Sequence, residues 1–171
     1  MMLSVGTINE MNQTEFVEAF GDVAEHSPWV AEGAFSQGAF ATREDLIVAF
    51  ETTMLDAPKQ RQLELVRAHP DLAGKAAIAG DMAEDSKREQ SGAGLDTLSP
   101  DEFARFTDLN DRYQKRFGFP FIFAVKGADK HMILHAFAQR VDNAPEQEFT
   151  AALAQISRIF RFRLEDRVGE S

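Results

Sequence analysis

The sequence predicts an all-α fold: one compact domain over residues 1–171, built as a bundle of about eight helices with a short extended segment near residues 119–125. Apolar residues recur every three or four positions through most of the chain, which is the periodicity of helices that bury one face. Residues that cap helix starts stand at the beginning of several such stretches. Only one short apolar run has the character of an extended strand, and no second run could pair with it, so we expect no sheet.

The first clearly marked helix lies in TREDLIVAFETTML, residues 42–55. Thr42 is placed to cap its N-terminus, and the acidic residues that follow complement the helix dipole. Its expected buried face consists of Leu46, Ile47, Phe50 and Met54. A second helix follows in APKQRQLELVRAHP, residues 57–70. We expect it to end at His69, because a proline disfavours helical dihedral angles in the residue before it.

A stretch of small and polar residues, 74–98, separates this helix from the next and is the least clearly defined part of the chain. The next helix lies in SPDEFARFTDLNDRYQKRFGF, residues 99–119, where Ser99 and Glu102 form a capping box. Gly118 is expected to stop it. Its apolar stripe is predicted to contain Phe103, Phe106, Leu109, Tyr113 and Phe117.

The run FPFIFAV, residues 119–125, is the predicted extended segment. Extended backbone packed among helices has no ladder of hydrogen bonds, and its buried N–H and C=O groups need partners. Two interpretations stay open. The partners are either the amide groups of a planar ligand or side chains and water around a simple connection.

Two more helices are expected, at residues 129–141 and 143–168. The buried stripe of the last helix contains Phe149, Leu153, Ile156, Ile159 and Phe160. At about 100° per residue, Arg163 falls inside this stripe, whereas Arg161 points toward solvent. A buried guanidinium must be paired or must bind an anion, because an unpaired buried charge is too costly. A structural salt bridge and an anion site have equal weight here. Arg167 also projects near the stripe, where we expect the helix to fray.

Composition excludes several classes of protein. The net charge of −10 argues against nucleic-acid binding, which needs clustered Lys and Arg. The chain has no cysteine, which excludes disulfides, thiolate metal sites and a thiol nucleophile and suits a reducing cytoplasm. No apolar run is long enough for a membrane span, and we recognise neither a signal peptide nor a peroxisomal tripeptide.

The four histidines offer different chemistry. His26 lies near a predicted helix end. His131 and His135 have the i, i+4 spacing of a two-histidine metal face, but no glutamate accompanies them, so a metal-dependent hydrolase is the weaker alternative. His69 is held at a corner by the following proline, where an imidazole is well placed for proton transfer. A structural role at a helix end is the simpler interpretation of His69 alone.

The stretch SKREQ, residues 86–90, also has two interpretations. Ser86 and Glu89 match a capping box that opens a short helix. The start of a helix also binds anions, and Ser86, Glu89, Gln90 and Ala93 share one helical face that is polar at one end and small at the other. Such a face is suited to line a pocket.

Taken in series, several motifs resemble one family, the 2-oxo-4-hydroxy-4-carboxy-5-ureidoimidazoline (OHCU) decarboxylases of urate breakdown. The matching segments have the same order and spacing as in that family and span nearly the whole chain. They are HPDLAGK at 69–75, EQSGAGLDTLSPDE at 89–102, LNDRYQKRFGFPFIFAVKG at 109–127 and RFRL at 161–164, with a looser match in SPWVAEGAF at 27–35.

The resemblance implies an all-helical enzyme, usually a homodimer, that needs no cofactor and no metal and converts OHCU to (S)-allantoin and carbon dioxide. It implies that His69 is the catalytic acid and base, that Glu89 is its partner and that Arg163 is the family's C-terminal arginine. The substrate-binding residues that it implies are Pro70, Ser86, Lys87, Arg88, Gln90, Phe121, Ile122, Phe123, Ala124 and Val125.

The chain departs from the family pattern in one region. Gly33 stands where relatives tend to carry a basic residue, and Gln37, Gly38 and Ala39 stand where an Arg-Pro pair is common. Neither departure involves a residue of the implied site. We therefore expect them to affect dimer packing or an outer wall of the pocket rather than the chemistry. We expect a bacterial-type cytoplasmic enzyme that acts on a small molecule without nucleic acid or membrane. A helical binding module without catalysis is the alternative from another class.

Overall fold

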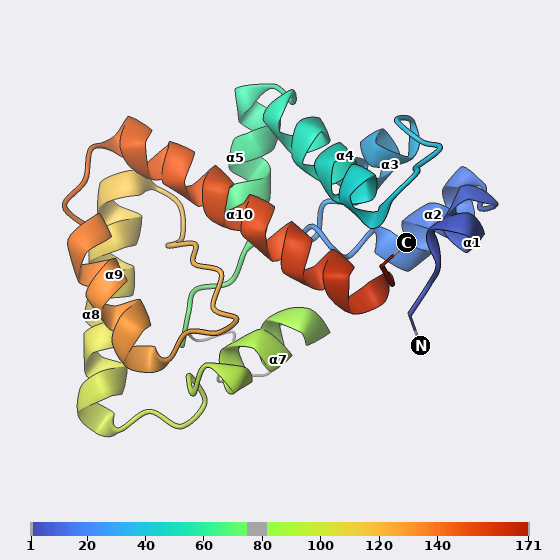
Figure 1. Ribbon diagram of the computed structural model, residues 1–171. Helices are drawn as coiled ribbons and strands as arrows, with labels where there is room; N and C mark the ends of the chain where they lie inside the picture. The colour runs from blue at the N-terminus through green and yellow to red at the C-terminus, as the bar shows by residue number, and fades with distance from the viewer. Residues whose placement is uncertain (1, 75–81, 171) are drawn as a thin grey trace. The chain divides into compact units, whose positions relative to one another are not determined.

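The computed structural model describes residues 2–74 and 82–170 of the chain. Within them the chain forms nine helices and no strand, which confirms the all-α prediction (Figure 1). None of these helices is long and apolar enough to cross a membrane. The residues between 75 and 81, including the lysine that ends the HPDLAGK motif, lie outside the described part. The helices are α1 (Val5–Asn9), α2 (Gln13–Phe20), α3 (Trp29–Phe35), α4 (Arg43–Leu55), α5 (Lys59–Ala68), α7 (Glu84–Gly92), α8 (Pro100–Phe117), α9 (Lys130–Arg140) and α10 (Pro145–Arg167).

The chain divides into two compact units. The terminal unit comprises Met1–Ala68 with Ser157–Ser171, and the central unit comprises His69–Ile156. The long helix α10 contributes its first half to the central unit and its second half to the terminal unit.

Phenylalanine rings fill the core of the terminal unit. The Phe16 ring lies 5.0 Å from that of Phe20 and 6.3 Å from that of Phe50, measured between ring centroids. Phe50 in turn lies 6.0 Å from Phe160 of α10. All four rings are fully buried, and they join α2, α4 and the end of α10 into one apolar core. Aromatic pairs at these separations stabilise a core beyond the area they bury.

Gly33 allows α3 to pack closely against α4. A Cβ atom at position 33 would lie 2.4 Å from Cγ2 of Thr53, a distance at which something must shift. The Thr53 hydroxyl is held by a bond to the Ala49 carbonyl (2.8 Å), and it accepts a bond from Gln37 Nε2 (2.7 Å). The two departures from the family pattern are therefore parts of one helix contact.

The predicted start and end of α8 are confirmed. The Ser99 hydroxyl accepts a hydrogen bond from the Glu102 N–H, and the Glu102 carboxylate accepts one from the Ser99 N–H. Gly118 ends the helix in the left-handed conformation, with φ at 76°. The predicted stripe is buried at Phe106, Leu109 and Tyr113. It is wrong at Phe103, which is 40% exposed one turn into the helix.

The end of the chain corrects one further expectation. The last helix does not fray before Arg167, since α10 extends to that residue. A backbone hydrogen bond of 2.8 Å from Leu3 to the Arg167 carbonyl and one of 2.9 Å from Gly169 to the Leu3 carbonyl tie the helix end to the N-terminal segment. These bonds satisfy backbone groups that a free helix end leaves unpaired.

Candidate functional site

His69 lies immediately after α5, at the boundary that the following proline predicts. His69 is only 7% exposed, whereas the neighbouring Pro70 is half-buried. Burial beside a turn that proline restricts limits the orientations open to the imidazole, which suits proton transfer to a bound molecule.

The loop after His69 is fixed by amide side chains from two helices. Ala73 adopts the left-handed conformation with φ at 54°, and its N–H donates to Oε1 of Gln90 in α7 (3.0 Å). Gln90 Nε2 donates to the Asp71 carbonyl (3.3 Å). Asn110 of α8 donates to the Leu72 carbonyl (2.9 Å). The Gln90 amide, which the resemblance assigns to substrate, is thus engaged by the loop that follows His69.

Helix α7 begins earlier than the capping-box interpretation requires. It starts at Glu84 after Ala83, which provides no side-chain cap, and Ser86 occupies the third helical position. The prediction that Ser86 caps the helix is therefore wrong, because the helix has already begun two residues before it. Glu84 and Asp85 form the first turn, where acidic residues suit the helix dipole. Ser86 and Gln90 are both 5% exposed, and Glu89 is half-buried. The expected face of α7 is thus turned inward.

The two cations of α7 lie outside that inward face. Arg88 pairs with Asp85, and its side chain is 75% exposed. Lys87 Nζ lies 3.3 Å from Oε1 of Glu84, and its side chain is 39% exposed. The structure therefore places Lys87 and Arg88 nearer solvent than Ser86 and Gln90.

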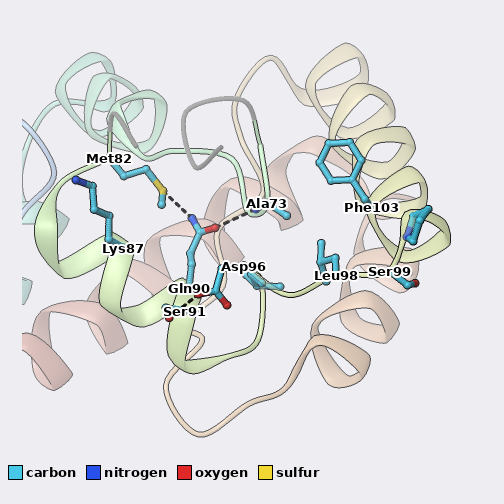
Figure 2. Close-up of a pocket in the computed structure, with 11 residues that line it drawn as sticks. Ala73, Met82, Lys87, Gln90, Ser91, Asp96, Leu98, Ser99 and Phe103 are labelled. Atoms are coloured by element: carbon cyan, nitrogen blue, oxygen red, sulfur yellow. Dashed lines mark hydrogen bonds between the residues drawn. The ribbon is translucent and has the colours of Figure 1, made fainter. Parts of the chain in front are cut away.

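A pocket of about 710 Å³ opens beside α7 and the start of α8 (Figure 2). Two of the implied substrate residues, Lys87 and Gln90, line it, and His69 and Glu89 do not. The exposed Phe103 forms part of the wall, which explains why it departs from the buried stripe. The lining residues are Ala73, Met82, Lys87, Gln90, Ser91, Leu95, Asp96, Leu98, Ser99, Pro100 and Phe103.

The segment 119–125 forms neither helix nor strand, and most of it is buried. Phe121 and Ile122 are 1% and 2% exposed, whereas Phe123 is half-buried. Ala124 is 3% exposed and Val125 5%. Side chains satisfy part of this backbone. The Ala124 N–H donates to Gln155 Oε1 (2.9 Å), and the Ile122 carbonyl accepts from Arg140 Nη1 (2.7 Å).

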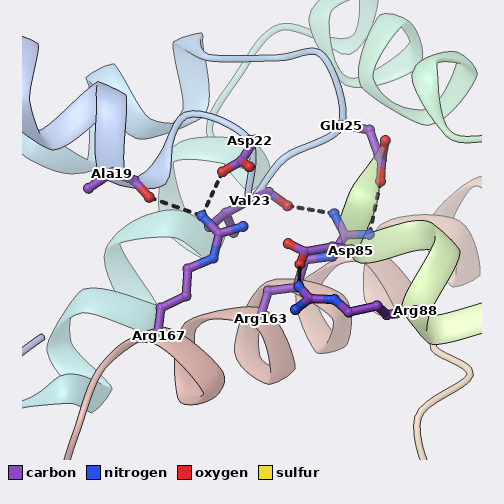
Figure 3. Close-up of polar contacts among 8 residues, drawn as sticks. All are labelled: Ala19, Asp22, Val23, Glu25, Asp85, Arg88, Arg163 and Arg167. Atoms are coloured by element: carbon purple, nitrogen blue, oxygen red, sulfur yellow. Dashed lines mark hydrogen bonds and ion pairs between the residues drawn. The ribbon is translucent and has the colours of Figure 1, made fainter. Parts of the chain in front are cut away.

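Arg163 is buried, as its position in the helical stripe predicts, and it is paired (Figure 3). Its Nη2 lies 2.9 Å from Oε1 of Glu25, and its Nη1 donates to the Val23 carbonyl (3.0 Å). Both partners of the ion pair are almost fully buried, at 3% and 1% exposure of the side chain. The structural salt bridge that the sequence left open therefore exists.

The neighbouring arginines of α10 lie nearer solvent. Arg161 makes two hydrogen bonds of 2.7 Å to the Glu44 carboxylate, which lowers the pKa of that carboxyl group. Arg167 Nη1 donates to the Ala19 carbonyl (3.0 Å) and to Asp22 Oδ1 (2.6 Å). The expected contrast between a buried Arg163 and a more exposed Arg161 is confirmed.

The implied site residues fall in different units of the chain. His69, Pro70, Ser86–Gln90 and Phe121–Val125 belong to the central unit, and Arg163 belongs to the terminal unit. Sequence reasoning missed Glu25, which stands between Ala24 and His26 with no local pattern that marks it as buried. It also missed the amide of Asn110.

The other histidines offer no competing centre within the described residues. His131 and His135 are both exposed on α9, and His26 is exposed in a left-handed turn with φ at 46°. In that part of the chain, no group of three or more His, Cys, Asp or Glu side chains is arranged to hold a metal ion.

Comparisons of sequence give one consistent result. A family model described as "OHCU decarboxylase" matches residues 9–165. A 2-oxo-4-hydroxy-4-carboxy-5-ureidoimidazoline decarboxylase of Halalkalicoccus jeotgali is 42% identical over 96% of this chain and 91% of that protein. The Mus musculus protein of the same description is 38% identical over 95% of this chain and 91% of that protein. A uric acid degradation bifunctional protein of Bacillus subtilis is 38% identical over 99% of this chain, which spans 33% of that protein.

Comparisons of structure agree. A crystal structure of (S)-allantoin synthase superposes with a TM-score of 0.77 at 31% identity, covering 97% of this chain and 54% of that chain. The chain thus spans about half the length of that protein. An OHCU decarboxylase crystallised in the presence of (S)-allantoin gives a TM-score of 0.69 over 85% of this chain and 94% of that one. At 24% identity, this second likeness shows the shared fold.

Proposed function

The chain belongs to the OHCU decarboxylase family, and from that membership we propose that it converts OHCU to (S)-allantoin and carbon dioxide in urate degradation. The observation that carries the proposal is the family match over residues 9–165, a range that contains the His-Pro motif at 69–70 and Glu89 of α7. The fixed, buried position of His69 at the end of α5 supports a role in proton transfer.

The substrate itself explains what the protein has to do. OHCU carries a carboxylate and a hydroxyl group on one ring carbon, beside a C=N bond. When carbon dioxide leaves, the electron pair of the broken C–C bond forms a new C=C bond, the C=N electrons move to nitrogen, and that nitrogen takes a proton from solvent. The substrate is its own electron sink, so the reaction needs no cofactor for that purpose. The remaining tasks are orientation, charge placement and one stereospecific protonation.

Each task is assigned to a residue. His69, oriented by Glu89, accepts the hydroxyl proton as the carbonyl of allantoin forms and takes part in its return to the neighbouring carbon. Arg163 binds anionic or carbonyl oxygens of the substrate. The backbone of Phe121–Val125, with Pro70 and the inward face of α7, holds the ring amide and ureido groups. Arg163 is buried and charged, which supports its role.

The direct test is turnover of freshly generated OHCU, made from urate by urate oxidase and hydroxyisourate hydrolase. We expect the wild type to give (S)-allantoin, measured by circular dichroism, and we expect His69→Ala to lower kcat about 10²–10⁴-fold, the usual contribution of a general acid or base. Glu89→Gln should lose activity and keep its helical spectrum. The matched control is His135→Ala, which removes an exposed histidine of α9 and should keep full activity. Full rate and stereoselectivity in His69→Ala would refute the catalytic role.

Two broader properties belong to the same proposal. We propose that the protein is a homodimer, as the resemblance implies, and sedimentation velocity on the purified protein tests this. We also propose that it works in the cytoplasm, since a chain without cysteine suits a reducing compartment. Its net charge of −10 is consistent with a small-molecule substrate rather than nucleic acid.

A further inference from the structure

A buried polar cluster lies directly against the proposed substrate-binding segment, and the proposed mechanism does not use it. The Glu148 cluster consists of Tyr113, Arg140, Asn143 and Glu148. Glu148 is fully buried and accepts hydrogen bonds from the Tyr113 hydroxyl (2.6 Å), Arg140 Nε (2.9 Å) and Asn143 Nδ2 (2.9 Å). Burial and the bond to Glu148 raise the pKa of Tyr113, so the phenol stays protonated and remains a donor.

Arg140 connects this cluster to the segment 119–125. Its Nη1 donates to the Ile122 carbonyl (2.7 Å), and its guanidinium carbon lies 4.4 Å from the centre of the Phe121 ring. The same ring stacks on Phe137 of α9 at 3.9 Å, with the two planes 7° apart. One planar cation therefore joins a buried carboxylate, a backbone carbonyl and an aromatic face, a combination that suits arginine and not lysine.

The bond to Ile122 has a consequence for the next residue. A trans peptide is planar, so its C=O and N–H groups point in opposite directions. Because Arg140 fixes the Ile122 carbonyl, it also fixes the Phe123 N–H, which must point away from Arg140. In the same way, Gln155 binds the Ala124 N–H and so turns the Phe123 carbonyl away from Gln155.

These two side chains thus orient both polar groups of one residue. Within residues 2–74 and 82–170, neither the N–H nor the C=O of Phe123 has a hydrogen-bond partner. Phe123 is also the half-buried member of a run whose neighbours on both sides are buried. A donor and an acceptor on one residue, both without a protein partner in the described part of the chain, suit the ureido and ring amide groups, each of which presents an N–H beside a C=O.

We infer that Arg140 and Gln155 are positioning residues that present the main-chain N–H and C=O of Phe123 to the amide groups of the substrate. The inference rests on the proposed function and makes it more specific, because it names one peptide donor–acceptor pair and the side chains that set its direction. Since these bonds involve parts of the substrate that do not react, their loss weakens ground-state and transition-state binding alike. The signature is a raised KM with kcat nearly unchanged, in contrast to the loss of kcat expected for His69→Ala.

The test compares two Arg→Lys substitutions with similar surroundings. Arg140→Lys keeps the charge but loses the planar guanidinium that binds both Glu148 and the Ile122 carbonyl. We expect KM for OHCU to rise about tenfold, with kcat within about threefold of the wild-type value. Arg43→Lys is the matched control, because Arg43 also binds a backbone carbonyl, that of Val168 (3.1 Å), and a carboxylate, that of Glu170 (3.3 Å). The two arginines are similarly buried, since the side chain of Arg140 is 14% exposed and that of Arg43 is 19% exposed. Arg43→Lys should leave KM unchanged.

Two further variants separate positioning from stability. Tyr113→Phe removes one bond to Glu148 and leaves the Arg140–Ile122 bond in place, so it should lower the melting temperature with little effect on KM. Gln155→Leu removes the second positioning bond and should raise KM as Arg140→Lys does, and it decides the question if Arg140→Lys does not fold. Titration with (S)-allantoin should show the same rise in Kd without turnover.

The outcomes are distinguishable. If the wild type does not turn over OHCU, the proposed function fails. If the wild type is active and Arg140→Lys and Gln155→Leu keep the KM of Arg43→Lys, the positioning role is refuted. A rise in KM for Tyr113→Phe equal to that for Arg140→Lys would likewise overturn it, because KM would then follow stability alone.

Discussion

Arg163 forms an ion pair of 2.9 Å with Glu25, and both side chains are almost fully buried. Its burial follows from the phase of the apolar stripe in α10, and the structure confirms it at 3% exposure. Its partner Glu25 lies 138 positions away in the chain, so no local pattern predicts the pair. Burial can be predicted because it depends on the helix that carries the residue. The identity of the residue that pairs with it depends on the rest of the fold.

The Arg163–Glu25 pair allows the structural and catalytic roles to be separated. Glu25→Leu alone leaves a buried guanidinium without its carboxylate and should destabilise the protein by about 3–5 kcal/mol. The double variant Glu25→Leu/Arg163→Met removes both charges and should regain most of that stability, since replacing a whole buried pair is often nearly neutral. Urea denaturation measures both effects.

Activity of the double variant then assigns the role of Arg163. If the arginine binds substrate oxygens, the stable double variant is inactive, and this is the outcome we expect. An active double variant would mean that the arginine serves the salt bridge alone. Asp22→Asn is a suitable control, because it weakens the more exposed pair of Arg167 in the same unit.

At the scale of elements, helix starts and stops were predictable where they depend on local bonds. The Ser99–Glu102 box and Gly118 define α8 because their hydrogen bonds and dihedral angles involve neighbours in the sequence. The same reasoning was wrong for Ser86, because the box pattern also fits a serine and a glutamate inside a helix. An N-cap stabilises a helix by only about 1 kcal/mol, so the path of the preceding chain can decide at which residue the helix begins.

The interactions that fix the site elements were not predictable in this way. Tyr113 and Glu148 are 35 residues apart, and Asn110 and Leu72 are 38 apart. The sequence pattern shows only that Tyr113 faces inward. Which carboxylate it meets depends on how α8, α9 and α10 pack within the central unit.

The start of α8 has a pH dependence that follows from its ion pair. Glu102 Oε1 accepts a bond of 2.8 Å from Lys130 and one of 2.9 Å from the Ser99 N–H, and these bonds lower the pKa of Glu102 from 4.5 to about 2. Because the pKa is lower in the folded state, the stabilisation is complete above about pH 4.5 and is lost as the pH falls toward about 2.

We therefore expect Glu102→Gln to lower the melting temperature by an amount that is largest above about pH 5 and shrinks progressively as the pH is lowered toward about 2. Thermal unfolding followed by circular dichroism over this range measures it. Asp101→Asn removes another acidic residue of the first turn and controls for the helix dipole. A difference that stays constant with pH would show that the Glu102 charge is not the cause.

At the scale of the whole molecule, the residues assigned to the reaction are divided between the two units. His69 and Glu89 belong to the central unit and Arg163 to the terminal unit, and α10 runs through the division between Ile156 and Ser157. A mechanism that uses all three residues therefore requires both units to be folded. Folding of both units is thus a condition of the proposed function, and the length of the sequence predicts that they unfold cooperatively as one domain.

Two natural probes make that condition measurable. The single tryptophan, Trp29, lies in the terminal unit, and the single tyrosine, Tyr113, lies in the central unit. If the chain is one cooperative domain, urea transitions followed by tryptophan fluorescence and by tyrosine absorbance coincide. Gly33→Ala, which forces a Cβ against Thr53 in the terminal unit, should destabilise the fold by about 1–3 kcal/mol and shift both transitions together.

The matched control for Gly33→Ala is Gly92→Ala, since a Cβ at position 92 meets no atom within 4 Å. Without a clash, alanine in a helix is favoured over glycine by roughly 0.5–1 kcal/mol, so this variant should leave the midpoint unchanged or raise it slightly. If Gly33→Ala moved the tryptophan transition and left the tyrosine transition in place, the units would unfold independently. The chain would then have two domains, contrary to the single domain that the sequence predicts.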